Sequence, residues 1–346
     1  MDMNIAKLID RLIENGINDG AFPSAVAAVG LKEELLACTW RGNTRIDGGT
    51  PVNEYTLYDM ASLTKILAPT MIALRAIEEG LLTLDDTVGR FFDAPDDKKD
   101  ITVRMLMTHT SGVTPAFDLS SESSGPDDAV RAILAHPLDG VPGDMPRYSC
   151  MGYILFAKML EKLYGKKLDT LANDMVFAPL GMNHTGYLPN DTNVAATELN
   201  RRTGELIQGI VHDENARFMG GVSGNAGVFS DLEDMIKFTE MLAMGGKDYL
   251  SANTLRVAIR NRTPGFDVHR GLGFHLGGTT QNYLGDLLPP ESFGHTGFTG
   301  TSIAVDPTTG FYVILMTNRV HPTRDNLKLM RFRRAFHNAL YAAGAK

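Results

Sequence analysis

Hydrophobic residues are spaced differently at the two ends of the chain and in its middle. Near the N-terminus, the apolar residues of segment 4–17 recur every three to four positions with charged residues between them, which predicts an amphipathic helix. Two short apolar runs, 24–30 and 34–41, follow and are separated by the polar residues Lys32 and Glu33, a pattern typical of a β-hairpin. This end of the chain is therefore predicted to supply one helix and two paired strands.

Helical spacing dominates from residue 62 to about residue 216. A long helix is predicted over 62–79, ended by Gly80, and Pro69 is expected to kink it because proline removes one backbone hydrogen bond. The polar segment 118–128 is rich in Ser, Gly and Pro and predicts a surface loop. Shorter helices are predicted over 102–107, 129–135 and 153–164, the last of them closed by Gly165.

Strand patterns return toward the C-terminus. Ser230 and Glu233 form a capping box ahead of an apolar helical face. Segments 301–306 and 311–317 then predict a hairpin, and a last helix is predicted over 326–342.

Strands at both ends of the chain, with helices between them, predict an α+β fold in α/β/α layers. One antiparallel sheet would be formed by the N- and C-terminal segments, flanked by helices, and a mostly helical domain would be inserted into it. The expected division places 1–75 and 217–346 in the sheet domain and 76–216 in the inserted domain.

Composition narrows the possible partners. The chain has 346 residues, of which 43% are hydrophobic and 21% charged, as in an ordinary globular protein. Its formal net charge of −8 argues against nucleic acid as a partner. The two cysteines, Cys38 and Cys150, form neither a disulfide framework nor a metal motif, and no run is apolar enough to span a membrane. We therefore expect no metal or other cofactor and, because segment 4–17 is not a signal sequence, a cytoplasmic location.

Ser62 and Lys65 lie three positions apart at the start of the predicted 62–79 helix. Residues i and i+3 of a helix project from the same face, so the hydroxyl and the amine would be adjacent. An adjacent base activates a serine as a nucleophile, and a helix N-terminus favours the negative charge that develops on the intermediate. The pattern predicts a catalytic serine beside a base, with a serine that only caps the helix as the alternative.

Two later motifs extend this pattern. Tyr148-Ser149-Cys150 lies in a loop leading into a helix, and His295-Thr296-Gly297 precedes a strand. With the S-x-x-K motif at Ser62, their order resembles the serine β-lactamase and penicillin-binding protein superfamily, specifically the branch of class C β-lactamases, D-aminopeptidases and family VIII esterases. The stretches that carry the resemblance are 61–88, 106–112, 142–165, 179–185 and 294–301.

The resemblance implies a β-lactamase/transpeptidase-like fold with the active site between the two domains. It also implies an acyl-enzyme on Ser62, with Lys65 or Tyr148 as the base for acylation and Tyr148 activating water for deacylation. The oxyanion hole would be formed by the backbone N–H groups of Ser62 and Phe298. The residues implied in substrate binding are Cys150, His295, Thr296 and Gly297.

Two positions depart from the family pattern. Cys150 replaces the usual Asn of Y-x-N, and a thiol cannot reproduce the two-ended hydrogen bonding of an amide. His295 replaces the Lys of K-T-G, and a histidine is mostly neutral at pH 7, whereas a lysine would suit substrates with a free carboxylate. These departures predict an enzyme for esters, or for amides without a strict carboxylate anchor, that hydrolyses β-lactam antibiotics slowly.

The same chain suggests other interpretations. Neither Ser149 nor Ser223 has the G-x-S-x-G context of an α/β-hydrolase. His109 and the segment 212–214 are predicted to be structural, since three consecutive residues cannot all point at one metal ion. The partner expected is a small-molecule or short-peptide acyl substrate, and the oligomeric state is left open. A catalytically impaired module that binds ligands or acts as a scaffold is the alternative function.

Overall fold

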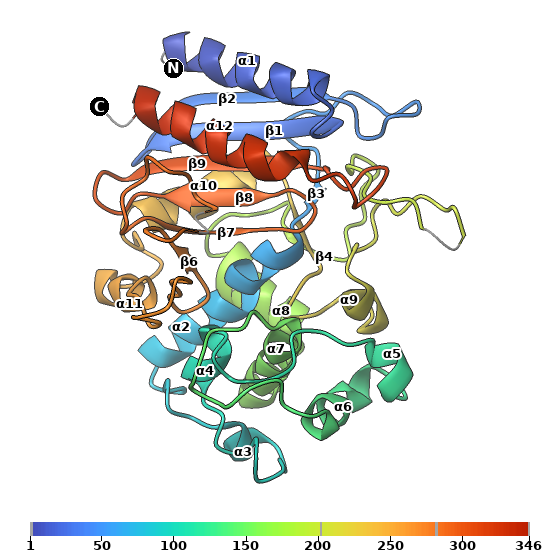
Figure 1. Ribbon diagram of the computed structural model, residues 1–346, viewed down its shortest axis with the longest axis vertical. Helices are drawn as coiled ribbons and strands as arrows, with labels where there is room; N and C mark the ends of the chain where they lie inside the picture. Colours follow the sequence, from blue (N-terminus) through green and yellow to red (C-terminus); the bar gives the residue numbers. More distant parts are fainter. Residues whose placement is uncertain (1–2, 201–202, 281–282, 345–346) are drawn as a thin grey trace.

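The computed structural model describes residues 3–200, 203–280 and 283–344 (Figure 1). The helices are α1 (Met3–Asn18), α2 (Met71–Glu78), α3 (Val88–Phe91), α4 (Val103–Met107), α5 (Leu119–Glu122), α6 (Ala129–Ala135), α7 (Cys150–Tyr164), α8 (Leu168–Ala172), α9 (Glu214–Phe218), α10 (Leu232–Ala243), α11 (Ala252–Ala258) and α12 (Lys328–Gly344). The strands are β1 (Ser24–Leu31), β2 (Glu34–Gly42), β3 (Tyr58–Asp59), β4 (Gly186–Tyr187), β5 (Val228–Ser230), β6 (His275–Leu276), β7 (Phe293–Thr296), β8 (Ser302–Val305) and β9 (Phe311–Thr317).

Six strands form one antiparallel sheet in the order β2-β1-β9-β8-β7-β6. Strand β1 pairs with β2 on one side and with β9 on the other, so the two ends of the chain meet inside the sheet. In this register Val26 lies opposite Trp40 in β2 and Met316 in β9. The predicted fold class, an antiparallel sheet built from both ends of the chain, is confirmed.

Helices cover both faces of this sheet. Helices α1 and α12 lie over one face (Figure 1), where Ala25 and Val313 are buried in a core shared with these helices. Val26 and Ile314 point to the opposite face and belong to the larger core, which includes α10. Because side chains alternate along a strand, successive residues of β1 enter two different cores, which explains why residues 25–29 are all apolar.

The predicted helix over 62–79 is not one regular α-helix. It begins as a 3₁₀ turn, Ala61–Leu63 (η1), passes through a π-helical turn, Ile66–Thr70 (η2), and becomes α-helical only in α2. Pro69 lies inside the π-helical turn. Proline has no N–H to donate, so the backbone ladder is interrupted there and adopts the wider turn.

The predicted capping box at Ser230 and Glu233 is wrong. Asp231 caps α10 instead, and its Oδ1 accepts a hydrogen bond of 2.9 Å from the backbone N–H of Asp234. The reason is that Ser230 is the last residue of β5, where it pairs with Tyr58 of β3. A residue held in a strand ladder is not free to cap the helix that follows.

Two other boundaries differ from the prediction. Helix α7 begins at Cys150, three residues earlier than predicted, because the Ser149 hydroxyl accepts a hydrogen bond of 2.9 Å from the Gly152 N–H and caps it. Segment 118–128 is not all loop, since it contains α5 and a 3₁₀ turn, Pro126–Asp128.

The larger organisation can be followed along the chain. Helices α3 to α8 all lie between residues 76 and 216. The division into a sheet domain, 1–75 and 217–346, and an inserted domain, 76–216, stays a prediction. Among the helices of the described ranges, none combines the length and the apolar character needed to cross a membrane.

The packing of α1 against the sheet gives a stability prediction. Ile9 is fully buried between α1 and the sheet, so Ile9→Ala should lower the free energy of unfolding by about 2 to 5 kcal/mol. Lys7→Ala, on the exposed side of the same helix, should change it by less than about 0.5 kcal/mol. Urea unfolding of both variants measures the difference, and equal effects would contradict the packing described here.

Candidate active site

Ser62 and Lys65 meet at the start of the η1–η2–α2 segment. The Lys65 Nζ lies 3.1 Å from the Ser62 Oγ and donates a hydrogen bond to it. Ser62 is partly exposed, whereas Lys65 is fully buried. The serine hydroxyl is therefore open to a substrate on one side and in contact with an amine on the other.

A strained turn precedes Ser62. Ala61 has a φ of +44°, a conformation that costs energy for a residue with a Cβ. The buried carboxylate of Asp59 holds this turn, because its Oδ1 accepts a hydrogen bond of 2.8 Å from the Ala61 N–H and its Oδ2 accepts one of 2.6 Å from the His212 N–H. Burial raises the pKa of Asp59, while these two backbone hydrogen bonds lower it.

The glycine-rich segment 220–227 lies against Lys65 from the other side. The Lys65 Nζ donates a hydrogen bond of 2.9 Å to the Asn225 carbonyl, and the Asn225 side chain donates one of 3.0 Å to Asp213. At Gly224 a Cβ atom would lie 2.2 Å from the Tyr153 carbonyl, so only glycine fits there. The backbone of this glycine-rich segment therefore packs closely beside the site.

His109 fixes the position of Tyr148. Its Nδ1 accepts a hydrogen bond of 3.1 Å from the Ser149 N–H, and its carbonyl accepts one of 2.7 Å from the Arg147 N–H, so both chain neighbours of Tyr148 are attached to it. The imidazole and phenol rings are 4.4 Å apart. In this position the Tyr148 ring centroid lies 4.8 Å from the Lys65 Nζ.

Cys150 completes the contacts of the lysine. Its Sγ accepts a hydrogen bond of 3.6 Å from the Lys65 Nζ, and the residue is half-buried in the first turn of α7. Lys65 thus contacts one residue of each of three segments: the hydroxyl of Ser62, the thiol of Cys150 and the backbone carbonyl of Asn225.

The third motif lies beside the turn that carries Ser62. A Cβ atom at Gly297 would lie 2.1 Å from the Thr301 Oγ1 and 2.6 Å from the Met60 carbonyl, so the chain just after β7 lies directly against the turn that carries Ser62. The next residue, Phe298, has its carbonyl bound by the Arg319 Nε at 2.9 Å, and its ring lies 5.7 Å from that of His212. The backbone of this motif is therefore fixed next to Ser62.

His295 is a buried side chain without a charge at neutral pH. It is 1% exposed, and its Nδ1 lies 2.9 Å from the Thr296 carbonyl, which makes Nδ1 the protonated nitrogen of the neutral ring. Burial, Lys65 and Arg270 hold the pKa of His295 well below its usual range. The motif therefore presents a neutral imidazole where the family usually has a lysine.

Burial and charge act in opposite directions on the two candidate bases. Burial alone would lower the pKa of Lys65, but the neighbouring Cys150 and Tyr148 outweigh it and raise that pKa. Burial outweighs the lowering effect of the Lys65 ammonium on Tyr148, so the pKa of Tyr148 is raised above its usual value. Ser62 hydrogen bonding is a smaller lowering effect on the same pKa. At neutral pH the amine is charged, and it favours ionisation of the phenol beside it.

Sequence reasoning missed three residues of this site. Asp59 and Asn225 act through backbone groups, and no motif spacing indicates such contacts. Arg270 packs with its guanidinium carbon 5.5 Å from the Tyr148 ring centroid, and it lies outside all three sequence motifs. An isolated arginine in a glycine-rich loop gives no sequence signal for its burial.

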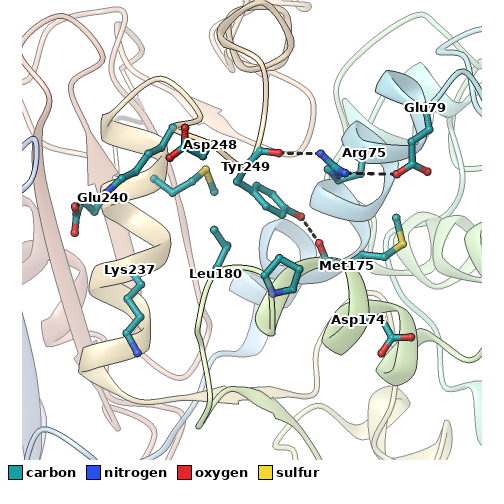
Figure 2. A pocket seen from close by; sticks show the side chains of 12 residues that line it. Arg75, Glu79, Asp174, Met175, Leu180, Lys237, Glu240, Asp248 and Tyr249 are labelled. Carbon is teal, nitrogen blue, oxygen red and sulfur yellow. Dashed lines mark hydrogen bonds and ion pairs between the residues drawn. The ribbon is translucent and has the colours of Figure 1, made fainter.

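Two other polar clusters of the structure form contacts among their own members. Figure 2 shows a pocket of about 570 Å³ in which Arg75 is bound to Glu79 and to the Tyr249 carbonyl, and none of the predicted site residues lines it. His184, Asp231 and Asp234 are close enough together to hold a metal ion. Their atoms already bind one another and cap α10, so these contacts account for the group without an ion.

The fold and the site define the class of protein. An antiparallel sheet between helices, with Ser62, Lys65 and Tyr148 gathered beside β7, is the arrangement of the β-lactamase/transpeptidase-like hydrolases. The Beta-lactamase family matches residues 9–337, and the chain belongs to this family. It is a member of the serine β-lactamase-like superfamily of hydrolases.

Individual relatives agree with this assignment. A protein of Escherichia coli K12 named "Putative D-alanyl-D-alanine carboxypeptidase" is 30% identical over 94% of this chain and 85% of its own length. The structure of EstCE1, described as a hydrolase with promiscuous acyltransferase activity, superposes with a TM-score of 0.81 at 22% identity, covering 97% of this chain and 98% of its own. The octameric penicillin-binding protein homologue of Pyrococcus abyssi has a TM-score of 0.75 at 19% identity, covering 98% and 76%.

The close approach at Gly297 can be tested directly. Gly297→Ala places a methyl group against the Met60 carbonyl, so it should lower thermal stability and displace the turn that carries Ser62. The matched control is Gly140→Ala, because a Cβ at that exposed loop position meets open space. Differential scanning calorimetry and the rate of Ser62 labelling by a fluorophosphonate should both change for Gly297→Ala only. Normal labelling of this variant would contradict the predicted displacement.

Proposed function

We propose that the chain is a serine hydrolase that cleaves an ester or an amide through an acyl-enzyme on Ser62. The observation that supports this most directly is the contact of 3.1 Å between the Lys65 Nζ and the Ser62 Oγ, with the Tyr148 ring 4.8 Å from the same nitrogen. These are the contacts that activation of a serine requires.

The proton of the Ser62 hydroxyl would pass to the phenolate oxygen of Tyr148 and not to Lys65. Because the pKa of Lys65 is raised, its amine is charged at neutral pH and has no free electron pair to accept a proton. The Lys65 ammonium stabilises the phenolate, which takes the Ser62 proton as the Oγ attacks the carbonyl. The phenol then protonates the leaving group, and Tyr148 activates the water that releases the acyl group.

The negative charge on the reacting oxygen would be met by the backbone N–H groups of Ser62 and Phe298. The close packing of Gly297 on the Met60 carbonyl supports this role, because it fixes the two backbone segments relative to each other. One such donor typically lowers the barrier by about 3 kcal/mol. Thr296, Gly297 and Cys150 would line the cleft in which the substrate lies.

The substrate class follows from the third motif. His295 is buried and neutral, so it offers no fixed charge for a free carboxylate. We propose a small-molecule or short-peptide acyl substrate without a strict carboxylate anchor, bound between the predicted sheet domain and the inserted domain. The name of the carboxypeptidase relatives supports testing peptides, and the description of EstCE1 as a hydrolase with acyltransferase activity supports testing other acyl compounds beside them.

Covalent labelling tests the nucleophile. The protein incubated with a fluorophosphonate should gain one adduct on Ser62, and Ser62→Ala should gain none because it lacks the reacting oxygen. Ser121→Ala, an exposed serine on α5, is the control and should label like the unchanged protein. Intact-mass spectrometry distinguishes the outcomes, and a protein that takes up no adduct would be the ligand-binding module instead.

Substrate comparison tests the role of His295. A short-chain nitrophenyl ester should be hydrolysed with a kcat/KM at least about tenfold above that of a cephalosporin, because the neutral imidazole does not attract the antibiotic's carboxylate. Both reactions are followed by absorbance with the same enzyme sample. Preference for the cephalosporin would reject the proposed substrate class while leaving the acyl-enzyme chemistry in place.

A further inference from the structure

Arg270 is a buried cation next to the catalytic tyrosine. It is 8% exposed, and its guanidinium carbon lies 5.5 Å from the centroid of the Tyr148 ring. No ion pair of Arg270 with a carboxylate is found among the described residues, and its Nε has no hydrogen-bond partner. A buried arginine is normally paired, so this arrangement calls for an explanation.

The loop that carries Arg270 is held in place by its backbone. The Arg270 N–H donates a hydrogen bond of 3.0 Å to the Thr263 Oγ1, and its carbonyl accepts one of 2.7 Å from the Arg262 N–H. The next residue, Gly271, is so close to the end of α11 that a Cβ atom would lie 2.3 Å from the Ala258 carbonyl. The position of the guanidinium beside Tyr148 is thus set by packing on both sides of the residue.

The imidazole rings around Tyr148 carry no charge that could replace that of Arg270. The rings of His109, His275 and His295 lie 4.4 Å, 6.3 Å and 6.3 Å from the Tyr148 ring. Burial and the nearby cations hold the pKa of all three well below the usual value for histidine. At neutral pH these rings shape the wall behind Tyr148, and the charge there comes from Lys65 and Arg270.

We propose that Arg270 is a positioning residue that stabilises the phenolate of Tyr148, and that it supplies behind the ring the fixed positive charge that His295 does not provide. The proposal rests on the function proposed above, in which Tyr148 accepts the Ser62 proton. Arg270 acts through Tyr148 and is not expected to touch the substrate, because its side chain is buried.

The size of the effect follows from the distance. At an effective dielectric constant of about 20, a unit charge this close to the ring changes the pKa of a neighbouring group by about one to two pH units. A cation near an aromatic face is also attracted to the ring itself, which offsets part of the cost of burying the guanidinium. Loss of the charge raises the Tyr148 pKa, so a smaller fraction of the enzyme has an ionised base at a given pH.

The titratable and charged groups around the Tyr148 ring all contribute to the pH dependence of the site. Lys65 lies on the Ser62 segment, and Cys150 and Tyr153 lie on α7. His109 follows α4, His275 lies on β6 and His295 lies on β7. Arg270 lies in the loop before β6. These groups are Lys65, Cys150, Tyr153, His109, His275, His295 and Arg270.

The experiment measures the rate of fluorophosphonate labelling of Ser62 against pH for the full chain and for Arg270→Gln. The alkaline-rising limb of the profile should move upward by about one to two pH units in the variant. At a fixed pH below the limb, labelling should therefore slow by about tenfold for each pH unit that the limb moves. Arg270→Lys, which keeps the charge, should stay close to the unchanged profile.

Controls separate this role from a structural one. Arg262→Gln removes a nearby arginine whose side chain donates to the Val257 carbonyl, and its profile should not move. His295→Lys combined with Arg270→Gln should return the limb toward its original position, because the cation is restored at the edge of the ring. If Arg270→Gln does not fold, Arg270→Met, whose apolar side chain suits a buried position, gives the same measurement.

The outcomes distinguish this inference from the proposed function. A limb that moves in Arg270→Gln and not in Arg270→Lys supports the inference. An unmoved limb, or a change only in the KM for an ester, overturns it and leaves the Ser62 chemistry standing. Labelling that survives in Ser62→Ala would instead reject the proposed function, whatever the result at Arg270.

Discussion

The buried ammonium of Lys65 is the interaction on which the rest of the site depends. A charge in this position needs several partners, and Lys65 finds them in Ser62, Cys150 and the Asn225 carbonyl. These groups come from three distant parts of the chain. The Lys65 ammonium therefore holds the segment that carries Ser62, the start of α7 and the glycine-rich segment in contact. The site can form only when the core around Lys65 is correctly folded.

Strain in the turn before Ser62 is balanced by the buried carboxylate of Asp59. The left-handed conformation of Ala61 brings Ser62 out toward solvent, and the Asp59 carboxylate offsets its cost by accepting two backbone hydrogen bonds. The Thr299 and Thr301 hydroxyls donate to the carbonyls of Asp59 and Met60, at 2.7 Å and 3.1 Å. The segment that follows the third motif thus supports the turn that carries Ser62 by hydrogen bonds to its main chain.

The sequence predicted the parts of this protein that depend on local pattern. The bounds of β9 and α6 follow from apolar spacing, and Ser62 beside Lys65 follows from helical geometry. The turn types around Ser62 could not be predicted, because a 3₁₀ turn and a π-helical turn at Pro69 depend on tertiary packing. Asp59 and Arg270 were missed for a related reason, since their contacts join residues far apart in sequence.

Charge explains how the site differs from the family pattern that its motifs resemble. With a buried His295 in place of a lysine, this motif carries no cation, and the neutral ring is held by the Thr296 carbonyl. Arg270 places a positive charge next to the Tyr148 ring in a buried position. With Tyr148 as the proposed base, this arrangement would keep the electrostatic support of the base and give up the attraction for an anionic substrate, so base activation and substrate choice would be separate properties of the fold.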